Sequence, residues 1–165
     1  MQNNQCKLAL LNSDDFADML AMFGEPDTFR YIPKLRDQTN EFYMQFLTST
    51  VEKIVAGDIY YWVMREPKND EFMGAINLNK ILNGDEMQIG WQICEGFRNQ
   101  GLAYLGAQMA LDFAIHKTEI EMVYGVFLEQ NKASERILNK LRFSLETISL
   151  ENEQLVHKYC FKISR

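Results

Sequence analysis

The chain has 165 residues, of which 47% are hydrophobic and 12% aromatic, a composition that fits one soluble domain over residues 1–165 with a sizeable core. Its net charge is −6 and its sequence pI is about 5.0, which disfavours a broad nucleic-acid-binding surface because such a surface needs a basic face. No segment has the length of a membrane span, and the opening MQNNQCK lacks the apolar stretch of a secretory signal. We therefore expect a cytoplasmic protein with no nucleic-acid or membrane partner.

The cysteines and histidines predict neither a disulfide framework nor a metal site. Cys6, Cys94 and Cys160 are odd in number and far apart in the sequence, as expected for reduced thiols. His116 and His157 are the only histidines, and neither has a cysteine or a second histidine at ligand spacing. We therefore expect no bound metal.

The first 57 residues predict a short strand and two helices. Ser13 and Thr39 are each placed to cap the first turn of one helix. Apolar residues recur at helical spacing along one face of both helices. The predicted bounds are Lys7–Leu11 for the strand, Asp14 to about Gly24 for the first helix, and Thr39 to Ala56-Gly57 for the second. The face of the second helix that we expect to be buried consists of Phe42, Phe46, Leu47, Val51 and Ile54.

The remainder of the chain predicts a sheet with two more helices. Turn-forming residues at Pro67–Asp70 and at Asn83-Gly84-Asp85 separate three strands, which indicates an antiparallel meander. The predicted strands are Ile59–Arg65, Phe72–Asn79, Met87–Ile93 and Ile120–Leu128, followed by a helix from Asn131 to near Arg142 and a hairpin of Phe143–Leu150 and Leu155–Ile163 around Glu151-Asn152-Glu153. The fold class is therefore a mixed α+β sheet flanked by helices.

The segment from Glu86 to Ala114 changes character twice. Glu86 to Ile93 alternates as a strand does, Glu95 to Gly101 is a polar loop with two glycines, and helical spacing begins at Leu102. The first N–H groups of a helix lack internal partners and lie at the positive end of its dipole.

This join between strand and helix suits a phosphate or pyrophosphate. Gly101 lets an anion approach the backbone closely, small Ala103 leaves the first turn open, and Arg98 can add a charge-assisted hydrogen bond. The alternative is an ordinary turn with a surface arginine. The segment is neither a P-loop nor a G-x-G-x-x-G motif, because the residues those motifs require do not follow.

Short motifs along the chain appear in a fixed order. Arg98-Asn99-Gln100-Gly101-Leu102-Ala103 resembles the Arg/Gln-x-x-Gly-x-Gly/Ala signature of the GNAT superfamily of N-acetyltransferases. Asn131-Lys132-Ala133-Ser134 and Lys140-Leu141-Arg142-Phe143 resemble the Asn-x-x-Ser and Lys-Leu-Gly-Phe elements of the branch that contains the ribosomal-protein N-terminal acetyltransferases. Glu25-Pro26-Asp27 and Arg30-Tyr31-Ile32-Pro33 are similar to the opening of the same Rim-type branch.

The resemblance implies a mostly antiparallel sheet of about seven strands with about four flanking helices and splayed strands at the cofactor site. It implies acetyl-CoA as co-substrate and direct attack in a ternary complex by a primary amine, either a protein N-terminus or a small amine. Dimers are frequent in the family, so a homodimer is also expected. The region of the first two helices would cover the acceptor, although core packing remains the alternative for its aromatic residues.

The resemblance also assigns roles to residues. The pyrophosphate would lie on the N–H groups from Asn99 to Ala103, and the pantetheine arm would pair with backbone between the strands at 87–93 and 120–128. The Ile93 N–H, or that of a neighbouring residue, would polarise the thioester carbonyl. The expected cofactor-binding residues are Ile93, Cys94, Arg98, Asn99, Gln100, Gly101, Leu102, Ala103, Asn131 and Ser134.

Ser134 and Asn131 each have two interpretations. Ser134 lies on an otherwise apolar helix face, so its hydroxyl either bonds the carbonyl one turn earlier or, as the resemblance implies, protonates the departing thiolate. Asn131 can cap its helix, contact the pantetheine arm, or do both.

The general base has no clear candidate. Many relatives carry a glutamate where this chain has Gln88, which leaves Glu86, Glu151 and Glu153 as the carboxylates to consider. Tyr159 lies in the last predicted strand, where core packing is the alternative to a role beside the acceptor. The missing acid also leaves open a second function, that of a catalytically degenerate module that binds or senses acyl-CoA.

Overall fold

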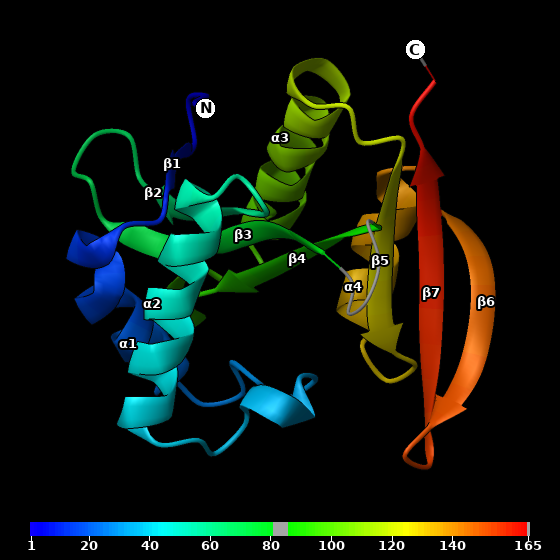
Figure 1. Cartoon of the computed structure of the whole chain (residues 1–165), viewed down its shortest axis with the longest axis horizontal. Helices are drawn as coiled ribbons and strands as arrows, with labels where there is room; N and C mark the ends of the chain where they lie inside the picture. Colours follow the sequence, from blue (N-terminus) through cyan, green and yellow to red (C-terminus); the bar gives the residue numbers. More distant parts are fainter. Residues whose placement is uncertain (81–85, 165) are drawn as a thin grey trace.

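The computed structural model describes residues 1–80 and 86–164, in which a seven-stranded sheet carries helices on both faces (Figure 1). The strands are β1 (Lys7–Leu10), β2 (Tyr60–Arg65), β3 (Phe72–Lys80), β4 (Met87–Ile93), β5 (Met122–Leu128), β6 (Ser144–Glu151) and β7 (Gln154–Lys162). The α-helices are α1 (Phe16–Phe23), α2 (Asn40–Val55), α3 (Leu102–Lys117) and α4 (Lys132–Lys140). The turn predicted at residues 83–85 lies outside the described residues.

The sheet has the order β1-β2-β3-β4-β5-β7-β6, and all neighbouring strands are antiparallel except β4 and β5. The mixed α+β class, the meander of β2, β3 and β4 and the closing hairpin of β6 and β7 are therefore confirmed. The parallel pair of β4 and β5 joins the two halves of the sheet across the connection that contains α3.

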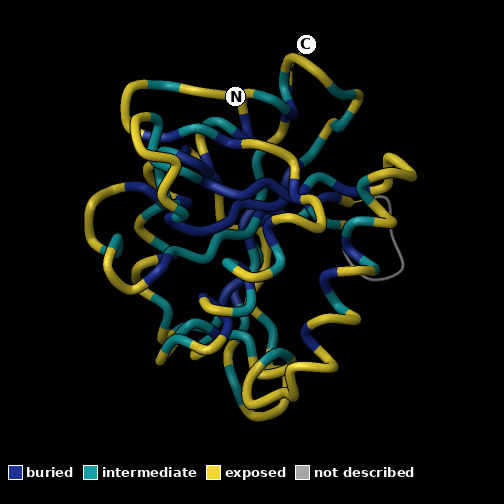
Figure 2. The backbone as a smooth tube through the Cα atoms, turned by 90° about the vertical axis from the view of Figure 1, so that its left-hand side faces the viewer, coloured by how far each residue is buried: buried dark blue, intermediate teal, exposed yellow. Residues whose placement is uncertain are grey.

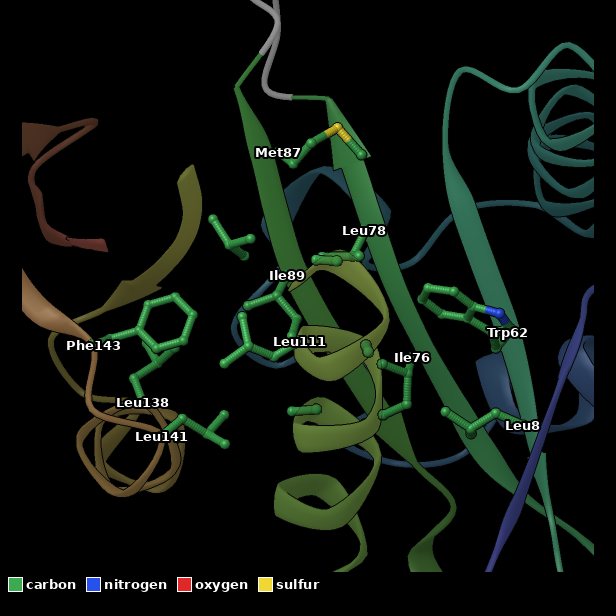
Figure 3. Packing of buried hydrophobic residues seen from close by; sticks show 14 of the residues in the cluster. Leu8, Trp62, Ile76, Leu78, Met87, Ile89, Leu111, Leu138, Leu141 and Phe143 are labelled. Carbon is green, nitrogen blue, oxygen red and sulfur yellow. The ribbon is translucent and has the colours of Figure 1, made fainter. Parts of the chain in front are cut away.

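The described residues form two hydrophobic clusters because side chains alternate between the faces of the sheet. Trp62 and Met64 of β2 face α3, whereas Tyr61 and Val63 face α1 and α2. Figure 2 shows buried segments running through the middle of the molecule between more exposed helices and loops. In Figure 3, Leu111 of α3 and Ile89 of β4 lie side by side in the larger cluster, with Phe143 and Leu138 on the α4 side.

Helix α3 lies close to the sheet because Gly106 has no side chain. A Cβ atom at Gly106 would meet the side chains of Met64 and Ile76. This glycine therefore lets α3 pack closely on the Met64 and Ile76 side chains.

The first helix begins differently from the sequence prediction. A 3₁₀ turn at Ser13–Asp15 precedes α1, and Asn12, not Ser13, is the cap. The Asn12 side chain accepts from the Asp14 N–H at 2.8 Å, and the Asp15 carboxylate accepts from the Asn12 N–H at 3.0 Å. Asp15 also binds Arg65 of β2, so the reciprocal cap ties the helix start to the sheet.

Substitution of Asn12 by alanine is expected to lower the free energy of unfolding by about 1 kcal/mol, because the cap bond is lost. Ser13→Ala, one residue along, is the matched control and should change it by less than about 0.5 kcal/mol. Urea denaturation of the three proteins measures both values. Equal losses for the two variants would contradict the assignment of the cap.

Helix α2 has the predicted cap but a rotated buried face. Thr39 accepts from the Phe42 N–H, as expected. Phe42 itself is 37% exposed, whereas Tyr43 is 7% exposed and packs against both Phe23 and Phe29. The prediction that Phe42 is buried is therefore wrong, because Tyr43 fills the aromatic cluster beneath the helix and donates its hydroxyl to Leu35 O.

Candidate active site

A gap opens between β4 and β5 where the two strands diverge, as their arrows show in Figure 1. Only Met87 and Gln88 pair with β5, at Val123 and Tyr124. The Cys94 N–H donates to Met73 O of β3 at 2.9 Å. Because successive backbone N–H groups of a strand point in opposite directions, the Ile93 N–H points away from β3 and toward the gap.

The N-terminus of α3 lies at this gap without a side-chain cap among the described residues. Gly101 has φ +80° and precedes the helix, and Asn99 also has a positive φ, of 62°. A Cβ built on Gly101 meets no atom within 4 Å. The space beside Gly101 is therefore open, and the first N–H groups of α3 lack a side-chain cap among the described residues, an arrangement that suits an anionic group.

One cavity of about 420 Å³ lies between this helix start and α4. Its wall also includes the segment between α1 and α2, from Asp27 to Ile32, which the sequence did not assign to the coenzyme side. Among the expected cofactor-binding residues, its lining contains Ile93, Arg98, Asn99, Gly101, Leu102, Ala103, Asn131 and Ser134. Cys94 and Gln100 are outside this lining, and the Gln100 side chain donates to Gly96 O.

A second cavity of about 400 Å³ lies on the face of the sheet that α1 and α2 cover. It follows the floor of β3 and β4 and reaches the ends of β5 and β7. The residues that line both cavities are Tyr31, Ile32, Trp91, Gln92, Asn131 and Ser134. The two cavities therefore meet at the gap between β4 and β5.

Ser134 stands at this meeting point and is 9% exposed. Its backbone N–H donates to Asn131 Oδ1 at 3.2 Å, so Asn131 caps α4 as expected. Within residues 1–80 and 86–164, the Ser134 hydroxyl makes no bond to the carbonyl one turn earlier, unlike the hydroxyls of Thr48 and Thr50 in α2. The hydroxyl is therefore free to bind a group inside the cavities.

Residues 6–144 match the family described as "Acetyltransferase (GNAT) domain". The chain belongs to the GNAT family. The resemblance to that family in its short motifs is confirmed.

Solved GNAT structures share the fold at low sequence identity. An enzyme from Salmonella typhimurium that modifies the N-terminal serine of ribosomal protein L7/L12 superposes with a TM-score of 0.84 at 14% identity, over 98% of this chain and 97% of that one. RimL, a ribosomal L7/L12 alpha-N-protein acetyltransferase in complex with coenzyme A, gives 0.82 at 16% identity, over 98% and 96%. Spermidine N-acetyltransferase from Vibrio cholerae with coenzyme A and spermine gives 0.82 at 15% identity, over 97% and 96%. No curated protein sequence matches significantly.

Arg98, the first residue of the GNAT signature, is engaged within the protein. Its guanidinium donates to the carbonyls of Ile93 at 3.0 Å and Pro26 at 3.2 Å, and to side-chain oxygens of Glu25 and Thr28. A second arginine, Arg136 of α4, lines the same cavity and has no ion-pair partner among the described residues.

The floor of the second cavity is formed by neutral polar side chains. Asn77, Asn79, Gln88 and Gln92 face the same side as Tyr61, whose hydroxyl donates to Gln92 Oε1 at 3.2 Å. Asn79 donates to Asn77 Oδ1, and its own Oδ1 is buried without a partner in the described structure. Asn77 and Asn79, at alternate positions of the mostly apolar strand β3, were the sequence signal that could have predicted this polar floor. Sequence reasoning missed that signal.

The candidate carboxylates lie in different places. Glu151 lines the second cavity and is the one carboxylate among the described residues that do so. Glu86 is exposed and pairs with Lys158 at 3.1 Å, and Glu153 lies in the exposed β6–β7 turn. Tyr159 is buried against Phe127 and lines neither cavity.

In the described ranges, no group of side chains is suited to hold a metal ion. No helix there has the length and apolar content to cross a membrane.

The Cys94 thiol, at the end of β4, is 8% exposed. Burial, with a smaller effect from Glu25, raises its pKa to about 12. The neutral thiol is thus favoured in the folded state, and this stabilisation is lost as the pH rises from about 9 toward about 12. A thiol that stays protonated is a poor nucleophile.

Cys94 is therefore expected to resist iodoacetamide at pH 8, with labelling roughly a thousand-fold slower than for an ordinary thiol. Half-buried Cys160 is the internal comparison. Peptide mapping by mass spectrometry gives the two rates in the folded protein, and in urea the two should become equal. Rapid labelling of Cys94 in the folded protein would contradict its assigned environment.

Proposed function

We propose that this GNAT domain transfers the acetyl group of acetyl-CoA to a primary amine by direct attack in a ternary complex. The observation that carries the proposal is the gap between β4 and β5, at which a cavity beside the α3 N-terminus meets a cavity on the opposite face of the sheet. Donor and acceptor can thus approach each other from two sides. The buried, protonated Cys94 thiol favours direct attack over an acyl-enzyme.

On the coenzyme side, the backbone N–H groups from Asn99 to Ala103 would hold the diphosphate at the positive end of α3. The pantetheine arm would pair with backbone groups along the gap. The Ile93 N–H would donate to the thioester carbonyl oxygen, and the Ser134 hydroxyl would supply the proton that the departing thiolate takes up. The described residues in these roles fit acetyl-CoA without a metal.

The acceptor side favours an amine of low basicity. Its floor offers amide groups from β3 and β4, with Glu151 at the rim as the carboxylate. An α-amine with a pKa near ~8 loses its proton at a cost of about 1.4 kcal/mol at pH 7, against about 4.6 kcal/mol for a lysine-like amine. We therefore favour the N-terminal amine of a peptide or protein, which a water relay to a weak base can deprotonate.

An acetyl-acceptor screen tests the proposal. The panel contains peptides with free N-termini, Nα-blocked peptides with one lysine, and spermidine, and it is read by thiol release and by product mass. We expect amine-dependent thiol release that is greatest with free N-termini. Affinity for coenzyme A without amine-dependent release would support the alternative of an acyl-CoA-binding module. The neutral Gln88, in place of a carboxylate, is the feature that favours this alternative. A cytoplasmic location and a homodimer stay predictions.

A further inference from the structure

Arg98 joins the end of β4 to the segment from Glu25 to Thr28. Its Nε donates to the Ile93 carbonyl at 3.0 Å, one Nη donates to the Pro26 carbonyl at 3.2 Å, and the other reaches Glu25 Oε2 at 3.4 Å and Thr28 Oγ1 at 3.3 Å. All three nitrogens of the guanidinium therefore bind protein oxygens. The planar fork of arginine presents donors from three nitrogens in fixed directions, whereas a lysine ammonium offers its three donors from a single atom on a flexible stem.

Glu25 completes this arrangement. Its Oε2 accepts from the backbone N–H of Glu95 at 2.7 Å as well as from Arg98. One carboxylate thus joins the end of α1 to the loop that leads from β4 into α3. The neighbouring segment from Asp27 to Ile32 forms part of the wall of the coenzyme cavity, so the contact sets the position of that wall relative to β4.

The bond to Ile93 acts directly on the gap. The N–H and C=O of one strand residue point to the same side, so the Ile93 carbonyl points into the gap with the Ile93 N–H. Arg98 donates a hydrogen bond to that carbonyl and so fixes the peptide group that follows Ile93. The Ile93 N–H is then left as a donor of defined direction.

We propose that Arg98 is a positioning residue that, with Glu25, aims the Ile93 N–H at the thioester carbonyl, and that it does not bind the phosphates of coenzyme A. The inference rests on the proposed function. The cation that faces the phosphates is then Arg136, which lines the same cavity and has no ion-pair partner in the described ranges. Substitutions of the two arginines are therefore expected to have opposite effects: loss of turnover for Arg98 and loss of coenzyme affinity for Arg136.

The test uses two donors that share the thioester and differ in the phosphates, acetyl-CoA and S-acetylpantetheine. Arg98→Lys keeps the charge and removes the fork, and it should lower kcat by roughly 10- to 100-fold with both donors. Its Kd for coenzyme A should change by less than about 3-fold, because the phosphate contacts remain. Arg136→Gln should raise the Kd for coenzyme A by roughly 10-fold, and it should lower kcat/KM far less for S-acetylpantetheine, which lacks the phosphates, than for acetyl-CoA.

Glu25→Gln supplies a second, milder variant, since an amide oxygen can still accept from Arg98 without the charge; a smaller fall in kcat is expected with both donors. Circular dichroism and thermal unfolding establish that each variant is folded. Normal kcat in Arg98→Lys, or a loss confined to acetyl-CoA, would overturn the inference. Absence of amine-dependent turnover in the wild-type protein would instead overturn the proposed function, and with it this inference.

Discussion

Gly101→Glu is expected to abolish coenzyme A binding while the protein stays folded. Gly101 precedes α3 with φ +80°, and a Cβ there meets no atom within 4 Å. The new side chain therefore has room, but it occupies the space in which we place the diphosphate. Its carboxylate binds the same N–H groups and repels the ligand, and juxtaposed like charges cost several kcal/mol. We expect at least a roughly 100-fold rise in Kd.

Gly57→Glu is the matched control for this variant. Gly57 follows α2 with φ +77°, and a Cβ there also meets no atom within 4 Å. The two variants thus share the backbone strain of about 1–2 kcal/mol and the change of charge, and differ in their distance from the gap. Calorimetric titration with coenzyme A and urea denaturation separate binding from stability. Unchanged affinity in Gly101→Glu would show that the phosphates lie elsewhere.

The order of the elements could be predicted because each is specified locally. Alternation defined β4, whose bounds at Met87 and Ile93 agree with the prediction. Two consecutive residues with positive φ, Asn152 and Glu153, close the β6–β7 hairpin at the place where turn-forming residues were noticed. Short-range patterns of this kind depend on few long-range contacts, so they can be read from one sequence.

The predictions of the first helix cap and of the buried face of α2 failed because contacts with residues distant in sequence determine both. Asn12 and Ser13 are both good caps, and the contact of Asp15 with Arg65, 50 positions away, accompanies the earlier start. Phe42 and Tyr43 both fit a helix face, and the aromatic cluster around Phe23 selects Tyr43. No local pattern distinguishes such pairs, because the choice depends on packing that only the folded chain contains.

The candidate site shows the same division. The glycine loop, the α3 N-terminus and Ser134 could be located from spacing and resemblance. The contacts of Arg98 with Glu25, Pro26 and Thr28 could not, since they span about 70 positions of sequence. A motif identifies which residue recurs in a family, whereas only coordinates show whether its side chain faces a ligand or the protein.

Ser134→Ala is expected to lower kcat by roughly 100-fold or more with acetyl-CoA, without a large change in the Kd for coenzyme A. The hydroxyl lies where the two cavities meet and makes no hydrogen bond within the described part of the chain. A positioned proton donor typically contributes about 10²- to 10⁴-fold to a rate. Its loss leaves the departing thiolate to take a proton from water.

The choice of leaving group distinguishes proton donation from a structural role of Ser134. An aryl thioester releases a thiol of low pKa, which departs as the anion and needs no proton. The penalty of Ser134→Ala should therefore be large for S-acetylpantetheine and small for the S-acetyl derivative of a nitrothiophenol, each compared with wild type at the same amine concentration. If Ser134 only supports α4 or the wall of the cavity, both donors lose the same factor, because the misplaced backbone affects the attack and not the departure. An equal loss would exclude Ser134 as the proton donor. Water in the gap between β4 and β5 would then protonate the departing thiolate.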